Sequence, residues 1–395
     1  MTKSKIQNPN NVSSIYFHIP FCKKKCNYCD FVSYAGKEDL IERYVEALVK
    51  EITALTRQPL TFPPLPEGEG NSTIYFGGGT PTLLEPRHFE TILQNVGTTF
   101  MVVRNRRTGT SPIPIFEITI EANPGTADKA KLKALRSLGI NRLSIGAQSF
   151  NDRHLRTLGR IHTAEEALKF YDDARSAGFD NINLDLMFAL PDQTFDQWKS
   201  DLKIAIDLEP NHLSTYNLQI EENTPLWEKG ASLSSADKGL KIPTEETELA
   251  MYEYTIETLT SAGYKHYEIS NFAKPGFECR HNINYWKNGN YIGIGAGAHS
   301  HVDGNRWSNP NCIEAYVTGH GSSIQGHRLE TRDLRPATIF LGLRLLEGLP
   351  AELFKGYENE VSNLLKDGLL EPMNGNYRLT RQGLYLGNLV FENFI

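Results

Sequence analysis

The chain has 395 residues, a formal net charge of −6 at neutral pH and five cysteines. The negative charge argues against nucleic acid or an anionic membrane surface as an electrostatic partner, and an odd number of cysteines is not a secreted disulfide framework. No apolar signal core opens the chain, and no run of about 18 apolar residues could span a bilayer. We therefore expect a cytoplasmic protein with an N-terminal tail over residues 1–14, a large domain and a smaller one.

Three cysteines gather in eight residues near the N-terminus: Cys22, Cys26 and Cys29. Clustered thiols at such spacing indicate a metal. A closed zinc site or a fully ligated iron–sulfur cluster needs four protein ligands, and this stretch supplies three. One metal position is therefore left open to a small molecule, unless His18 or a distant cysteine completes a structural zinc site.

Between residues 15 and 219, short β-rich runs alternate with helical stretches, which is the pattern of repeated βα units around a parallel sheet or barrel. The predicted strands cover 15–17, 73–76, 116–120, 142–150, 181–188 and 212–219. Six strand signals predict an α/β fold with an incomplete parallel (β/α)6 barrel that is open on one side. The chemistry of such a barrel is expected at the carboxyl ends of its strands.

Two features of this region bear on a ligand. Glycines at 77–79 follow the second strand and let the backbone pass close to a bound molecule. In the fifth strand, alternation places Asp185 on the face opposite Leu184, and a carboxylate inside a barrel is costly unless it binds something. The polar segments 59–71 and 104–114 are expected to be surface loops or insertions without chemistry.

A second distinctive stretch is His281-Asn282-Ile283-Asn284-Tyr285-Trp286. A histidine followed four and five residues later by aromatic side chains offers an axial iron ligand beside a flat apolar surface, as a haem requires. Packing or capping is the alternative role for this histidine. Cys279 lies close enough in sequence to be a rival haem ligand.

We expect residues 15–310 to form the barrel with an extension that carries this stretch, and residues 311–395 to form a separate module. Helices are predicted over 337–346, 357–366 and 381–393, with a hairpin turn at Asn374-Gly375. Helices around a hairpin suggest a winged-helix-like fold. Acidic side chains beside the second helix argue against DNA recognition, so we expect a lid or a partner-docking role.

The spacing Cys22-x3-Cys26-x2-Cys29, with an aromatic residue at Tyr28, resembles the cluster motif of radical S-adenosylmethionine (SAM) proteins. This resemblance implies a 4Fe-4S cluster held by the three cysteines, with SAM chelating the open iron. It also implies SAM contacts at positions that match the family's motifs: Tyr16, Tyr28, Gly78, Gly79, Thr80, Glu121, Gln148, Arg160 and Asp185.

Further strings extend the resemblance along nearly the whole chain, at residues 16–22, 77–82, 121–124, 144–150 and 281–286. Together they resemble the HemW branch of the oxygen-independent coproporphyrinogen III oxidase family. That branch consists of haem chaperones. The resemblance therefore implies that this chain binds haem, with His281 as its contact, and delivers the haem to acceptor proteins. It leaves open a homodimer and a peripheral contact with a membrane.

One departure concerns the alternative function, the oxidative decarboxylation of coproporphyrinogen III in porphyrin biosynthesis. The decarboxylases carry a further cysteine two residues after the third ligand, where this chain has Phe31. They also have a longer segment before the cluster. Both differences argue against that enzyme activity. Radical chemistry on another substrate, such as methyl transfer, would use the same SAM site and stays open.

Overall fold

The computed structural model describes residues 12, 14–56, 72–96, 117–231, 241–319, 329–330 and 334–395. The segments 59–71 and 104–114, expected to be surface loops, lie outside these ranges, as does most of the tail over 1–14. Within the described ranges, no helix combines the length and the apolar composition needed to cross a bilayer.

Six parallel strands form the centre of the molecule and lie side by side in chain order. They are β1 (Ser14–Ile19), β4 (Thr73–Gly78), β5 (Glu117–Ala122), β6 (Arg142–Gln148), β7 (Asn181–Phe188) and β8 (His212–Asn217). Each neighbouring pair is parallel. These strands confirm the predicted α/β class and the incomplete parallel barrel.

Both edges of this sheet are extended by strands that the sequence pattern did not predict. β11 (Tyr291–Ile294) pairs parallel to β1, and β12 (His299–Val302), β13 (Asn305–Ser308) and β14 (Leu329–Glu330) follow in antiparallel order. On the other edge, β10 (Asn271–Ala273) pairs antiparallel to β8, and β9 (Lys265–Glu268) pairs with β10. The result is a twelve-stranded sheet that begins with β14 and ends with β9.

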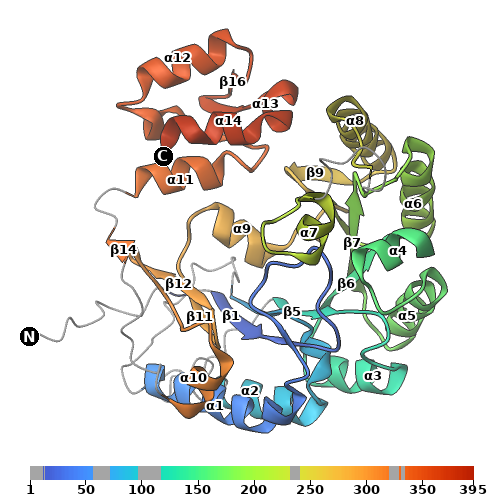
Figure 1. The fold of residues 1–395 in the computed structure, drawn as a ribbon. Helices are drawn as coiled ribbons and strands as arrows, with labels where there is room; N and C mark the ends of the chain where they lie inside the picture. The colour runs from blue at the N-terminus through green and yellow to red at the C-terminus, as the bar shows by residue number, and fades with distance from the viewer. Residues whose placement is uncertain are drawn as a thin grey trace, which may run out of the picture.

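Helices cover the outer face of the sheet (Figure 1). Those between the central strands are α1 (Ile41–Thr56), α2 (Pro86–Val96), α3 (Lys129–Ser137), α4 (Asp152–Leu158), α5 (Ala164–Ser176) and α6 (Phe195–Asp207); α8 (Glu245–Ser261) follows β8. Local capping fixes where several of them begin. Thr163 and Glu166 form a capping box at the start of α5, and Thr194 and Gln197 form another at α6, which satisfies amides that lack partners within the helix.

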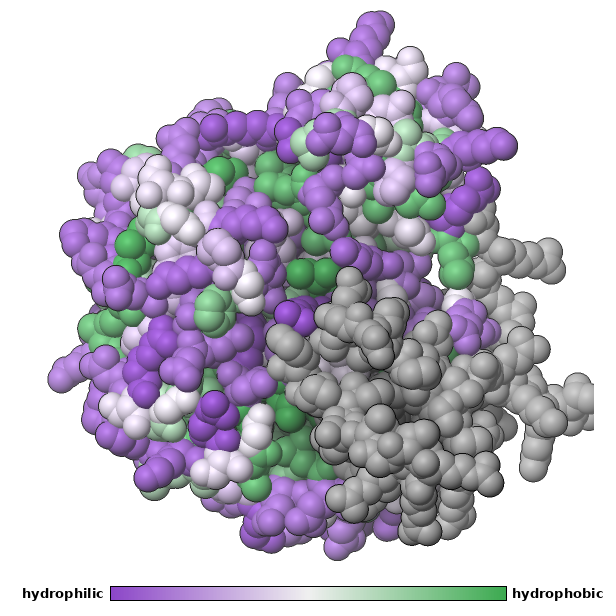
Figure 2. Space-filling model, turned by 180° about the vertical axis from the view of Figure 1, so that it is seen from behind, coloured by the Kyte–Doolittle hydropathy of each residue, from purple (hydrophilic) through white to green (hydrophobic). Residues whose placement is uncertain are grey.

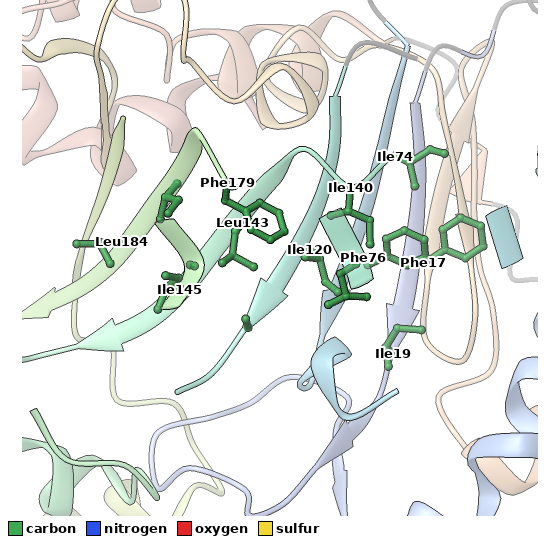
Figure 3. Packing of buried hydrophobic residues seen from close by; sticks show 14 of the residues in the cluster. Phe17, Ile19, Ile74, Phe76, Ile120, Ile140, Leu143, Ile145, Phe179 and Leu184 are labelled. Carbon is green, nitrogen blue, oxygen red and sulfur yellow. The ribbon is translucent and has the colours of Figure 1, made fainter. Parts of the chain in front are cut away.

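Alternation along the strands separates an apolar outer face from a polar inner one. Phe17, Phe76, Ile120 and Leu184 point into the layer between sheet and helices (Figure 3), and the rings of Phe17 and Phe76 stack with centroids 4.9 Å apart. Burying one such side chain contributes about 1.5–3 kcal/mol, so this layer fixes the register of the strands. The side chains that alternate with these apolar residues along each strand therefore point into the barrel.

The surface has the opposite character. The face in Figure 2 carries mostly hydrophilic side chains over its described part, with hydrophobic ones in small patches between them.

Residues 335–395 have a core of their own, which includes Ile339, Leu364 and Phe394. α11 (Arg335–Gly342) and α12 (Glu358–Lys366) pack beside a small sheet of β15 (Leu349–Pro350), β16 (Leu370–Met373) and β17 (Asn376–Leu379). The hairpin turn lies at Asn374-Gly375, where both residues have positive φ, as a two-residue turn of this kind requires.

Two details of this region differ from expectation. The closing helix predicted over 381–393 is divided into α13 (Arg381–Tyr385), α14 (Gly387–Phe391) and a 3-10 turn, because the chain leaves helical geometry at Leu386. In addition, α10 (Ile313–Thr318) contributes Ile313 and Tyr316 to the main core. The expected boundary at residue 311 therefore separates α10 from the core against which it packs.

Candidate functional site: the carboxyl end of the barrel

The cysteine loop follows β1 and the short strand β2 (Phe21–Cys22), which pairs with β3 (Tyr34–Ala35). Cys22 is buried, whereas Cys26 and Cys29 are half-buried. Burial raises the pKa of the Cys22 and Cys29 thiols. A bound metal reverses this preference, because its positive charge deprotonates a coordinating thiol.

Each of the three sulfurs has a polar neighbour. Thr80 donates from Oγ1 to Cys22 Sγ at 3.7 Å, Arg160 donates from Nη1 to Cys26 Sγ at 3.5 Å, and Ser33 Oγ lies 3.8 Å from Cys29 Sγ.

A side-chain relay joins two of these contacts. Asn123 donates from Nδ2 to Thr80 Oγ1 at 2.8 Å, and its Oδ1 accepts a hydrogen bond from Arg160 Nη2. Arg160 Nη2 also donates to the Gly146 carbonyl at 2.6 Å. Cys22 and Cys26 are thus connected through Thr80, Asn123 and Arg160. Asn123 was not among the predicted site residues, although it belongs to one of the strings on which the family resemblance rests.

The donor set does not match a zinc site completed by His18. The His18 ring lies 3.1 Å from Tyr16 Oη through Nδ1 and 2.7 Å from the Val32 carbonyl through Nε2, so both ring nitrogens have protein partners. Within the described ranges, no three His, Cys, Asp or Glu side chains form a group that could hold a metal ion. A four-iron cluster does not require such convergence, because its thiolates bind different irons.

The loop is anchored to the helices around it by Asn27. Its backbone amide donates to the Leu158 carbonyl at 2.9 Å, and its carbonyl accepts from Leu226 at 2.8 Å. Leu226 belongs to α7 (Pro225–Ala231), which lies across the front of the barrel in Figure 1. Tyr28 packs beside the small apolar cluster that includes Leu158 and Leu226 and lies near the charge of Arg160. Contacts with α4 and α7 therefore hold the cysteine loop in place.

The glycine segment is pressed against the same loop. A Cβ at Gly79 would lie 2.6 Å from the Phe21 carbonyl oxygen, and one at Gly78, whose φ is 111°, would lie 2.6 Å from the His18 ring. The Gly79 and Thr80 amides donate to backbone carbonyls of residues 19 and 21 at 2.9 and 2.7 Å. Close packing between strand ends thus requires glycine at both positions.

Two predicted carboxylates enter the barrel from β5 and β7, which lie on either side of β6. Glu121 accepts from Tyr75 Oη at 2.9 Å and from the Gly78 amide at 3.1 Å. Burial and the nearby Asp185 carboxylate raise the pKa of Glu121 to about 7. Asp185 accepts from Ser144 Oγ at 3.0 Å, and burial raises its pKa as well. The alternation in the fifth strand predicted this inward position correctly.

Gln148 and Tyr16 are two further predicted site residues on barrel strands, Gln148 at the end of β6 and Tyr16 within β1. Gln148 has φ of 66° and follows the register shift between β6 and β7, so the strand ends here in a left-handed residue. The ring of Tyr16 lies beside those of Tyr75 and His281, with centroids 6.2 and 6.4 Å away, and those two rings stack on each other at 5.0 Å.

His281 lies apart from the cysteine loop. It is buried in α9 (Arg280–Trp286) and contacts Thr73, which pairs with Ser14 at the start of β1. The cysteines follow the other end of β1, roughly 16 Å of strand away. The structure therefore gathers the cysteines with Thr80, Tyr28 and Arg160, and places His281 at the opposite end of the barrel.

The hydrogen bonds of His281 define its tautomer. Thr73 donates its hydroxyl proton to Ser14 at 2.9 Å, so His281 Nδ1, 2.8 Å from Thr73 Oγ1, carries the proton. Nε2 then accepts from Tyr285 Oη at 2.8 Å. Burial and the charge of Arg142 lower the His281 pKa to about 3, so the ring is neutral. An iron at Nε2 would have to displace the Tyr285 hydroxyl.

The match to known proteins agrees with this geometry. Residues 16–205 match the model of the radical SAM superfamily. Coproporphyrinogen III oxidase (HemN) from Escherichia coli, a radical SAM enzyme, has a similar fold with a TM-score of 0.79, 23% sequence identity, and coverage of 98% of this chain and 91% of that one. The chain is therefore a radical SAM protein, and the cofactors of this class are a 4Fe-4S cluster and SAM.

Curated relatives define the family more narrowly. The heme chaperone HemW of Lactococcus lactis subsp. lactis is 34% identical, over 99% of this chain and 98% of that protein. The heme chaperone HemW of Escherichia coli K12 is 35% identical, over 97% and 98%. The chain belongs to the HemW family of radical SAM proteins, which confirms the resemblance seen in its motifs.

Proposed function

We propose that this chain is a haem chaperone that binds a 4Fe-4S cluster, SAM and haem, and delivers haem to acceptor proteins. The observation that carries this proposal is the identity to heme chaperones along the full length of the chain. That identity includes α9 and residues 335–395, which lie beyond the region matched by the superfamily model.

Within this function, we assign the cluster to Cys22, Cys26 and Cys29. The polar neighbours at each sulfur support the assignment, because partners outside the metal's own ligands orient those ligands and tune the metal. When bound, the cluster supplies one-electron chemistry to SAM. The residues of this chain hold the sulfurs and keep the loop closed against α4 and α7.

We assign SAM to the adjoining interior of the barrel, at Tyr16, Tyr28, Gly78, Gly79, Thr80, Glu121, Gln148, Arg160 and Asp185. Two buried carboxylates with raised pKa values support this, since such groups gather at functional sites. Glu121 and Asp185 both face the interior of the barrel, where they bond to Tyr75 and Ser144. Gly78 is one of the residues that the resemblance assigns to SAM, and its amide donates to Glu121 in this structure.

We further propose a cytoplasmic location, because all five cysteines are unpaired, as expected in a reducing compartment. We also propose that the chain works as two units: the barrel with α10, and the module over residues 335–395, which has its own core.

The test is haem binding and transfer by the cluster-reconstituted protein under anaerobic conditions. We expect saturable one-to-one haem binding by absorbance and transfer to an apoprotein, such as apomyoglobin, faster than from serum albumin as a passive carrier. We also expect no SAM-dependent release of carbon dioxide from coproporphyrinogen III. Carbon dioxide release without haem transfer would instead support the decarboxylase.

A further inference from the structure

The module over residues 335–395 is joined to the barrel along a seam at β9 and α9, seen above α9 in Figure 1. Leu346 donates its amide to the Tyr267 carbonyl at 3.1 Å, and Leu345 forms an isolated β-bridge with Glu268. The guanidinium of Arg344 lies over the ring of Trp286, 4.4 Å from its centroid. Backbone and aromatic contacts thus hold the module against the helix that carries the HNxxYW string.

A cavity of about 480 Å³ opens at this seam, within the range of roughly 300–1,000 Å³ that is typical of small-molecule sites. Helix α9 and its C-cap residue line it with Arg280, Ile283 and Lys287, which are three and four residues apart and so share one helix face. His281 and Tyr285 occupy the opposite face, toward the barrel interior. The helix therefore separates two environments.

The lining is cationic at its rim. It includes the basic side chains of Lys265, Arg280, Lys287 and Arg378, against the lining carboxylates of Glu278 and Glu347 and that of Glu371, which pairs with Arg378 from outside the lining. This local excess of positive charge occurs in a chain whose net charge is −6. It favours an anionic ligand.

Arg378 is paired with Glu371, to which its Nε donates at 2.7 Å, whereas the two lysines have partners that a ligand can replace at low cost. Lys265 pairs with Glu278 at 3.2 Å, and Lys287 pairs with Glu347 at 3.3 Å. Three of these four side chains are 59–65% exposed, and exposed pairs contribute about 0–1 kcal/mol. A ligand carboxylate can therefore take over either lysine.

The rest of the lining is largely apolar, with Tyr267, Ile283, Leu345 and Leu346 beside the cations. A cavity with apolar walls and several cations at its rim suits a flat apolar molecule that carries carboxylates. Haem, with its macrocycle and two propionates, has this chemistry.

We propose that the seam cavity, on the outer face of α9, holds haem, with its propionates at Lys265, Arg280, Lys287 and Arg378 and its macrocycle against Ile283 and Leu345. This inference rests on the proposed haem-chaperone function and gives that function a site. It differs from ligation by His281, whose ring faces the other side of the helix and has both nitrogens engaged. Haem in this cavity would touch barrel and module together.

The test is an anaerobic haem titration of the full-length, cluster-reconstituted protein, followed by absorbance. Ile283→Trp fills the cavity, and Lys287→Glu reverses one charge at its rim. Lys169→Glu is the matched control, because Lys169 is an exposed lysine of α5 that is paired with a carboxylate away from the seam. We expect Kd to rise roughly tenfold or more in Ile283→Trp, to rise about fivefold in Lys287→Glu, and to stay unchanged in the control.

Haem dimethyl ester, which lacks the two carboxylate charges, separates charge from shape. We expect it to bind the unaltered protein more weakly than haem does and to show no further loss in Lys287→Glu. Wild-type affinity for haem in both seam variants would overturn the inference and leave the chaperone function standing. No haem binding by the unaltered protein would instead remove the proposed function. If Ile283→Trp does not fold, Lys287→Glu, altered at an exposed position, decides.

Discussion

The guanidinium of Arg160 lies 3.5 Å from the sulfur of Cys26, and the same side chain is fixed by Asn123, which also holds Thr80 against Cys22. One asparagine therefore positions the polar neighbours of two proposed cluster ligands. Its place at the end of β5 allows it to reach both sides of the loop. The loop's geometry thus depends on a residue that touches no sulfur.

This relay leads to the first prediction. Asn123→Ala should leave Arg160 and Thr80 without their common partner, and we expect the reconstituted cluster to be lost about tenfold faster under a chelator, a typical effect of removing such a supporting contact. The measurement is the decay of cluster absorbance at a fixed chelator concentration. Gln94→Ala, at an exposed position of α2, is the control. Equal decay in Asn123→Ala and the unaltered protein would contradict the proposal.

The second prediction concerns Glu117, at the start of β5. Its carboxylate accepts the backbone amides of Arg280 and His281 at 3.3 and 3.2 Å and lies near the buried guanidinium of Arg142. Glu117→Gln removes the negative charge that faces these two amides and the Arg142 guanidinium. We expect the free energy of unfolding in urea to fall by about 3 kcal/mol, as when a buried charge loses its counter-charge.

The control for this variant is Lys203→Ala, which breaks an exposed pair with Asp207 on α6 and should cost no more than about 0.5 kcal/mol. If Glu117→Gln cost as little as this control, Glu117 would not be what supports the start of α9.

The third prediction separates the two places at which haem could bind. Tyr285→Phe removes the hydroxyl that bonds His281 Nε2 and so frees the only lone pair of that ring. If haem occupies the seam cavity, its affinity should stay within about twofold of the unaltered protein, while stability falls by about 1 kcal/mol for the lost hydrogen bond. Haem titration and urea unfolding measure the two effects.

Tighter haem binding in Tyr285→Phe, with a changed Soret band, would show that His281 competes for iron when its partner is removed. His281→Ala should then abolish the gain, which makes the double variant the control.

Much of the central fold was predictable because its signals are local. The six parallel strands follow from apolar runs between helical stretches, and the capping box at Thr163 and Glu166 is set by residues three apart. The inward position of Asp185 follows from alternation along one strand. The three cysteines of the proposed cluster site were identified because they are adjacent in sequence.

What the sequence did not reveal depends on partners far apart in the chain. β9 to β14 are short, and their pairing comes from the edges that the central sheet offers. Asn123 acts through Thr80, 43 positions away, and Arg160, 37 positions away. The orientation of His281 is determined by Thr73, 208 positions away. No periodicity in the sequence encodes these contacts.

The last prediction uses Asp201, which lies on α6 and is 2% exposed. Its carboxylate accepts from Ser149 Oγ at 2.6 Å and from the Phe150 amide at 2.9 Å, directly after Gln148. Burial raises its pKa from 3.8 to about 6. The folded protein therefore holds this proton more tightly than the unfolded chain does, and the stability gained from it is present below pH 4 and lost as pH rises through 6.

Asp201→Asn should remove this dependence, since the amide can accept from Phe150 and donate to Ser149 at every pH. We expect the unfolding free energy of the variant, relative to the unaltered protein, to rise by about 3 kcal/mol between pH 4 and pH 7, because two pKa units correspond to nearly that amount. Urea unfolding of both proteins at each pH gives the difference, from which the titration of other groups cancels. A difference that stays constant with pH would mean that Asp201 titrates near its ordinary value and is not the buried acid inferred from its contacts.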